Sequence, residues 1–173
     1  MVPENFKLFI PKDQIKKAIS ALADQINHDY KGKKVILVGV LKGAFVFLAD
    51  IMRELQIPVA VDFVKLESYG HRKESSGTVK LLKDIDTDIF NHHVLIIEEI
   101  IDSGRTLHFL YDRLLASKPK SLKICALLDK KAKRVVPIEA DYVGIEVEDK
   151  FLIGYGLDFD QSYRNLPEIY YTD

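Results

Sequence analysis

The sequence has a single cysteine, no apolar run long enough to cross a membrane and almost no net charge. Cys125 cannot form an internal disulfide, so a reducing compartment is permitted, and its apolar neighbours predict a small buried side chain. The first residues lack the basic flank and apolar core of a secretion signal, and a membrane span needs about 20 apolar residues. A formal net charge of −1 gives no support for binding nucleic acid or a membrane surface. We therefore expect a cytoplasmic protein whose partners are small molecules.

The five histidines do not have the spacing of metal ligands, and the sequence shows no internal repeats and no linker. With 173 residues, of which 47% are hydrophobic, the chain is long enough to bury a self-sufficient core. Segments typical of strands and helices alternate through its middle. That order predicts an α/β fold in which residues 1–173 form a single domain, with a twisted, mainly parallel sheet and helices on both faces.

The individual elements follow from apolar periodicity. The expected helices are residues 11–30, 45–55 and 107–115, and the expected strands are residues 35–40, 59–66, 78–82, 94–97, 122–128, 142–147 and 151–155. Residues 67–77 are polar, bounded by glycine and without periodicity, and they are longer than an ordinary connection. This segment is either a functional lid or a solvated hairpin tip.

The chemistry is concentrated directly after the apolar strand 94–97. Glu98 and Glu99 come first, and because acidic side chains are rarely buried unpaired they require a cation, a donor-rich ligand or solvent. Asp102 to Thr106 then form a small polar loop before a helix, which is an arrangement that binds phosphate. A phosphorylated sugar with Mg²⁺ satisfies both halves, because the cation or the sugar hydroxyls separate the carboxylates from the phosphate. The alternative is an ordinary N-capped helix with Asp102 or Ser103 as the cap.

Two other loops follow apolar strands and carry lysine. Lys42 and Gly43 come after strand 35–40, where a glycine lets the backbone approach a ligand. Lys130 comes after strand 122–128, at the end of the sheet where α/β proteins bind ligands. Taken alone, the first loop is more typical of an ordinary connection, and the second is more typical of a solvated turn.

Residues 94–106 read Val-Leu-Ile-Ile-Glu-Glu-Ile-Ile-Asp-Ser-Gly-Arg-Thr, which resembles the phosphoribosyl-pyrophosphate (PRPP) motif of the type I phosphoribosyltransferases. Glu99 is a departure, because the second acid of that motif is usually Asp. The likeness extends over nearly the whole chain. Within the type I family it points to the 6-oxopurine, or hypoxanthine-guanine, phosphoribosyltransferases. It implies the fold of that family, with a flexible lid and a small hood formed by the chain ends.

The resemblance also implies roles for individual residues. It implies that Asp102 is the catalytic residue, which accepts or holds a proton of the purine. It also implies that Glu98 and Glu99 bind the ribose diol and Mg²⁺, with Asp158 as a third metal-binding acid. It implies a cis peptide between Leu41 and Lys42. The remaining assignments are Ser103, Gly104, Arg105 and Thr106 to the 5′-phosphate; Leu41, Lys42, Gly43 and Arg164 to pyrophosphate; Lys130, Phe151, Leu152 and Asp158 to the purine; and Ser68 and Tyr69 to the lid.

The reaction implied is Mg²⁺-dependent displacement of pyrophosphate from C1 of PRPP by N9 of hypoxanthine or guanine. The same family resemblance suggests a homodimer or homotetramer. Two alternatives stay open on the sequence: a non-catalytic regulator that binds PRPP or nucleotide on the same fold, and an unrelated phosphate-binding domain of receiver or flavodoxin type.

Overall fold

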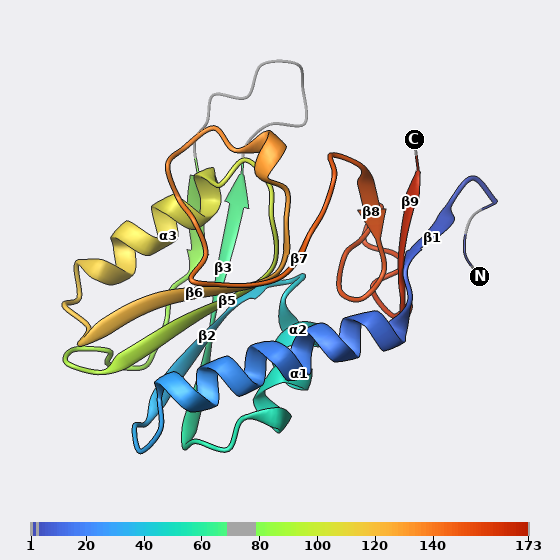
Figure 1. Cartoon of the computed structure of the whole chain (residues 1–173). Coiled ribbons are helices and arrows are strands. Elements are labelled where there is room, and N and C mark those ends of the chain that lie inside the picture. Colours follow the sequence, from blue (N-terminus) through green and yellow to red (C-terminus); the bar gives the residue numbers. More distant parts are fainter. Residues whose placement is uncertain (1, 3, 69–78, 173) are drawn as a thin grey trace.

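The computed structural model describes residues 2, 4–68 and 79–172 (Figure 1). In chain order the elements are β1 (Lys7–Ile10), α1 (Lys12–Asp29), β2 (Val35–Leu41), α2 (Phe45–Glu54), β3 (Val59–Ser68), β4 (Val79–Lys83), β5 (His93–Ile101), α3 (Arg105–Leu115), β6 (Ser121–Asp129), the 3₁₀ turn η1 (Lys131–Lys133), β7 (Tyr142–Glu146), β8 (Phe151–Ile153) and β9 (Ile169–Thr172). No helix in these ranges is both long and apolar enough to span a membrane.

A six-stranded sheet forms the centre of the molecule, in the order β4-β3-β2-β5-β6-β7. All neighbouring pairs are parallel except β3 and β4, which pair antiparallel. The central strands β2 and β5 are almost continuously buried, as expected of strands covered on both faces. The predicted α/β architecture is therefore confirmed.

The helices divide between the two faces of this sheet. In α1 the buried residues recur at three- and four-residue steps, which places one apolar stripe on the sheet; they are Ile15, Ile19, Leu22, Ala23 and Ile26. This helix shares a core with α2, which buries Phe47, Leu48 and Ile51. The opposite face packs against α3 (Figure 1). Cys125 lies in the first core and is fully buried, as predicted.

A second, smaller sheet forms a hood beside the first, and Figure 1 shows both termini on it. Its strand order is β1-β9-β8, and both pairs are antiparallel. β1 and β9 were not among the predicted strands, because each has only four residues and neither alternates cleanly between exposed and buried positions. The strand predicted at 151–155 is shorter than expected, and it belongs to the hood.

One predicted boundary is wrong in a way that matters for the site. β5 does not end at Ile97 but continues to Ile101, because its pairing with β6 runs on from Glu98 opposite Ala126 to Ile101 opposite Asp129. The two acids therefore lie within the strand and not after it. A strand position fixes their backbone more firmly than a loop would.

Candidate active site

A cavity of about 220 Å³ lies at the carboxyl ends of β2 and β5. Two loops that are far apart in the sequence line it together, namely the loop after β2 and the loop after β5. The lining residues are Val40, Leu41, Lys42, Gly43, Leu66, Glu98, Glu99, Ile100, Ile101, Asp102, Ser103, Gly104, Thr106 and Leu107. The structure thus joins the predicted pyrophosphate and PRPP segments in one site.

The loop from Asp102 to Thr106 leads directly into α3. Gly104 is the N-cap residue and has a φ of +82°, a conformation that favours glycine. With no side chain at the cap, the predicted alternative of capping by Asp102 or Ser103 is wrong, although the Arg105 N–H approaches Ser103 Oγ at 3.4 Å. The backbone N–H groups of this helix start and the helix dipole favour an anion such as phosphate.

Glu98 and Glu99 form a pair of neighbouring carboxyl groups, and the Glu99 N–H donates a 3.0 Å hydrogen bond to Glu98 Oε1. Burial raises the pKa of Glu98 well above its usual value, and the neighbouring Glu99 charge raises it further. Burial also raises the pKa of Glu99, against opposing hydrogen bonds and the Arg164 charge. Within the described part of the chain, Glu99 Oε2 is buried without a hydrogen-bond partner. An unpartnered buried carboxylate oxygen is costly, and a ligand that supplied a cation or donors would satisfy it.

Glu99 lies directly against the loop after β2. A Cβ atom on Gly43 would lie 1.7 Å from Glu99 Oε1, so only glycine leaves room for this carboxylate. The peptide between Leu41 and Lys42 is cis, as predicted. Lys42 Nζ donates a hydrogen bond of 2.7 Å to Gln161 Oε1, which ties this loop to the chain after β8.

The segment after β8 brings Asp158 and Arg164 to the same region. Arg164 Nη2 lies 2.7 Å from Asp158 Oδ1, and its Nη1 donates to the Gly156 carbonyl at 2.6 Å. Both side chains are mostly buried, at 18% and 27% exposure for Arg164 and Asp158. The Arg164 charge lowers the pKa of Glu99 and the Asp158 charge raises it, so the three groups act on one another.

The predicted purine-binding residues lie on two elements. Lys130, directly after β6, is 6% exposed, which corrects the alternative of a solvated turn at this position. Burial lowers its pKa, whereas the nearby Asp102 raises it, so the lysine and the predicted catalytic acid are neighbours. The side chain of Leu152 is buried in the core, which leaves its backbone for contact with a ligand.

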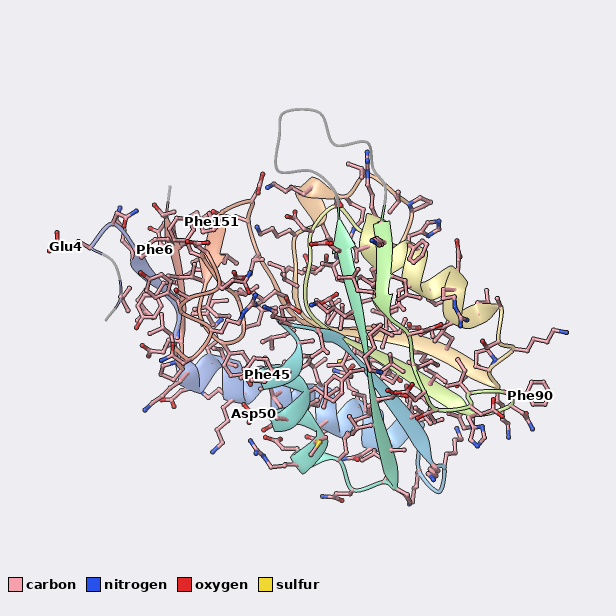
Figure 2. The ribbon with its side chains drawn as sticks, turned by 180° about the vertical axis from the view of Figure 1, so that it is seen from behind. Glu4, Phe6, Phe45, Asp50, Phe90 and Phe151 are labelled. Atoms are coloured by element: carbon pink, nitrogen blue, oxygen red, sulfur yellow. The ribbon has the colours of Figure 1, made fainter. Side chains whose placement is uncertain are left out.

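Phe151 is half exposed and belongs to a group of three aromatic rings. Its ring lies edge-on to Phe159, with centroids 5.8 Å apart, and 6.3 Å from Phe6 of the N-terminal segment. Figure 2 shows Phe6 and Phe151 side by side on the hood. An exposed ring face of this kind suits stacking on a purine.

Mg²⁺ fits this site as an ion shared with a ligand. Among the residues that the structure describes, no three His, Cys, Asp or Glu side chains come together as a metal cage. Magnesium is commonly held by one or two carboxylates together with substrate phosphates, and an unpartnered buried oxygen of Glu99 beside Asp158 meets that requirement.

The two predicted lid residues, Ser68 and Tyr69, are not tested by the structure. Tyr69 lies outside the described residues, and of Ser68 only the backbone is described, pairing with Val79. In turn, sequence reasoning missed Gln161, Phe6 and Phe159. Only Phe159 carried a signal, since it is adjacent to Asp158; the contact of Gln161 with Lys42 spans 119 residues and has no local signature.

Comparison with known proteins gives consistent matches. The Phosphoribosyl transferase domain family matches residues 11–160. A hypoxanthine-guanine phosphoribosyltransferase of Aquifex aeolicus is 46% identical over 98% of this chain and 96% of its own. The hypoxanthine phosphoribosyltransferase of Salmonella typhimurium is 46% identical over 94% of this chain and 93% of its own.

A crystal structure of a hypoxanthine-guanine phosphoribosyltransferase from Bacillus anthracis superimposes with a TM-score of 0.92 at 46% identity, over 96% of this chain and 98% of that one. Fold, sequence and site geometry therefore agree, and the chain belongs to the hypoxanthine-guanine phosphoribosyltransferases of the phosphoribosyl transferase domain family.

Proposed function

We propose that this chain is a purine-salvage enzyme that transfers the 5-phosphoribosyl group of PRPP to N9 of hypoxanthine or guanine, giving the mononucleotide and pyrophosphate. The observation that carries this proposal is the cavity shared by the loops after β2 and β5, with the buried Glu98 and the partly buried Glu99, whose Oε2 atom is buried, in its wall. PRPP has a 5′-phosphate, a diol and a pyrophosphate in that spatial order, and the cavity offers a complementary group for each.

The residues then take the following roles. The loop from Ser103 to Thr106 binds the 5′-phosphate, chiefly through backbone N–H groups. Glu98 and Glu99 accept hydrogen bonds from the ribose hydroxyls. The backbone of Leu41 to Gly43, the Lys42 ammonium and Arg164 stabilise the charge that develops on the departing pyrophosphate. Mg²⁺ shared between the substrate phosphates and one or two of the acids Glu98, Glu99 and Asp158 would also neutralise charge on that leaving group.

On the purine side, Lys130 donates to the carbonyl O6 of the base, and Asp102 accepts or holds the proton at N7. Phe151 stacks on the base, with the Leu152 backbone and Asp158 at its edge. We further propose that residues 1–173 act as a single domain in a cytoplasmic homodimer or homotetramer. Sedimentation velocity tests the oligomeric state, and a monomeric protein would contradict this part of the proposal.

The decisive experiment measures pyrophosphate release from PRPP with hypoxanthine, guanine, xanthine and adenine, each with and without Mg²⁺. We expect Mg²⁺-dependent turnover with 6-oxopurines. An ammonium cannot accept a hydrogen bond from a 6-amino group, so adenine should be disfavoured, by up to roughly 10⁴-fold in kcat/KM. Lys130→Ala should erode this selectivity while the affinity for PRPP stays the same.

Lys131→Ala is the matched control, because the neighbouring Lys131 pairs with Glu146 and is 60% exposed. It should keep the selectivity. Tight binding of PRPP or nucleotide without pyrophosphate release from any base would instead identify a regulator on the same fold. Comparable kcat/KM for adenine and hypoxanthine would overturn the role of Lys130.

A further inference from the structure

A buried ion pair lies next to Lys130, outside the residues assigned to the site. Arg134 Nη2 donates to Asp129 Oδ1, and the side chains are only 15% and 3% exposed for Arg134 and Asp129. In the described part of the chain, Arg134 Nη1 is buried and has no hydrogen-bond partner. Burying two charges is expensive, so a pair in this position suggests a function beyond stability.

On one side, Arg134 and the residues after it pack against the phosphate loop. A Cβ atom on Gly104 would lie 3.0 Å from Arg134 Cδ, 2.8 Å from Ile138 and 3.1 Å from Val136. The Val135 N–H donates a 3.0 Å hydrogen bond to the Ser103 carbonyl. The loop that binds the 5′-phosphate therefore rests directly on the chain that begins with Arg134.

On the other side, Asp129 directly precedes Lys130, the proposed purine-recognising lysine. Asp129 ends β6 opposite Ile101 and Glu146, and its carbonyl accepts from the Val147 N–H at 2.9 Å. The next backbone N–H, that of Lys130, donates to the Ile101 carbonyl at 2.9 Å. The turn η1 then reverses the chain, so that Arg134 returns to Asp129.

We propose that Arg134 is a positioning residue, which through its ion pair with Asp129 fixes the span between the phosphate loop and Lys130. A mononucleotide has its phosphate on the loop and its base on the lysine, so this span must match the ligand. The proposal rests on the proposed function, and it concerns the distance between two subsites whose ligand-binding groups other residues supply. A misplacement of about 1 Å can cost roughly 10²-fold in rate.

The test uses Asp129→Asn/Arg134→Met, which removes both buried charges together and so leaves none unpaired. Calorimetric titration compares two ligands. Hypoxanthine mononucleotide spans the phosphate loop and Lys130, whereas Mg²⁺ with PRPP does not reach Lys130. We expect the nucleotide affinity to fall by at least about tenfold, equivalent to roughly 1.4 kcal/mol, and the PRPP affinity to change by less than about threefold.

Arg134→Lys keeps the positive charge but loses the planar guanidinium, which can donate two parallel hydrogen bonds. It should therefore lower the nucleotide affinity by a smaller factor. Lys131→Met is the control in the same turn, because its ion pair with Glu146 is more than half exposed, and it should bind both ligands like the parent. Thermal unfolding of each variant shows that it is folded at the temperature of the titration.

Equal losses for the two ligands would mean that Arg134 supports the phosphate loop alone, and unchanged affinities would mean that it positions nothing. Either result overturns the inference. A parent protein that binds no nucleotide would instead overturn the proposed function. A loss confined to the nucleotide supports the span between the two subsites.

Discussion

Glu99 is the residue at which this chain departs from its family's motif, and its longer side chain reaches the loop after β2. Its carboxylate fills the space that the absent side chain of Gly43 leaves, and one oxygen is buried. A Glu99 carboxylate that merely faces solvent is therefore excluded, whereas its service to the ligand beside Glu98 stays a prediction. The extra methylene of Glu99, compared with Asp, places its carboxylate against Gly43 in the neighbouring loop.

We expect Glu99→Asp to stay within about tenfold of the parent kcat/KM, because the charge and both acceptors remain. Glu99→Leu keeps the bulk and removes the charge, so it should raise KM for PRPP more than KM for the purine. Steady-state kinetics with each substrate varied in turn measure both effects. Parent-like KM and kcat in the Leu variant would remove Glu99 from the site.

The contact with Gly43 allows a second, independent test of the same geometry. Gly43→Ala should impair the parent, since the new methyl group would meet the Glu99 carboxylate. The shorter side chain of Glu99→Asp withdraws from that position, so the double variant should recover part of the lost activity. A double-mutant cycle without coupling would show that the two residues do not share this space.

Asp102 is exposed at the entry of the phosphate loop, beside the buried Lys130. We expect Asp102→Asn to lower kcat by roughly 10²- to 10⁴-fold, the usual contribution of a positioned general base, while PRPP binding persists. Single-turnover kinetics and PRPP titration separate the two quantities. Turnover above about a third of the parent rate would show that Asp102 is not the base.

At the scale of elements, Asp62 on β3 organises the start of the connection from β4 to β5. It is 8% exposed and accepts hydrogen bonds from the backbone N–H groups of Phe63, Asp86 and Thr87 at 2.7 to 2.8 Å. Burial alone would raise the pKa of Asp62, but these N–H donors and the Thr87 side chain outweigh it and lower the pKa to about 2.

A carboxyl group whose pKa is lowered on folding stabilises the protein above its unfolded pKa, and that contribution is lost as the pH falls through the folded value. For Asp62 the window runs from about pH 4 down to about pH 2. We expect Asp62→Asn to lower the free energy of unfolding by about 2 kcal/mol at pH 7, an order-of-magnitude figure from the shift. The difference should shrink on acidification.

Denaturant unfolding of the parent and Asp62→Asn between pH 7 and pH 2 measures how this difference in the free energy of unfolding depends on pH. Asp86→Asn is the control, because the Asp86 side chain is 88% exposed and its ion pair with Lys83 lies at the surface. That substitution should change stability by less than about 0.5 kcal/mol. A constant difference between parent and Asp62→Asn across the pH range would contradict the linkage.

Periodicity predicted the three helices and the central strands because each buries a complete apolar face. Periodicity failed for segments that form strands through pairing with a neighbouring strand and not through an apolar pattern of their own. β5 carries two acids inside its ladder, and β1 and β9 are too short to show a period. The site loops were predictable since they follow apolar strands, whereas the Lys42–Gln161 and Arg134–Asp129 contacts depend on the tertiary fold.

In the molecule as a whole, the segment between β8 and β9 of the hood lies against the loop after β2 at Gly156. This residue has a φ of +95°, and a Cβ atom there would lie 2.3 Å from the Gly43 carbonyl oxygen. Since the colliding atom belongs to the backbone, it cannot move away as a side chain could. The position of the loop after β2 is therefore set by the hood.

We expect Gly156→Ala to reduce stability and to raise KM for PRPP, because the new methyl group would displace the loop after β2, for which we propose pyrophosphate binding. Gly32→Ala isolates the conformational part: Gly32 has a φ of +73°, but a Cβ atom there would meet no atom within 4 Å. Its cost should stay near the roughly 1–2 kcal/mol of a left-handed residue, with parent kinetics. Equal kinetics in the two variants would contradict the coupling.

The interleaved order of the hood also bears on how the protein matures. Its middle strand, β9, follows β1 and β8 in the chain, and all six strands of the central sheet precede it. Chains fold as they emerge from the ribosome. The large sheet can therefore assemble before β1 has its partner, and Phe151 gains its pairing with Thr172 only when β9 is inserted. Completion of the hood, and with it the fixing of the Phe151 backbone, is then a late event in biosynthesis that depends on the four residues of β9.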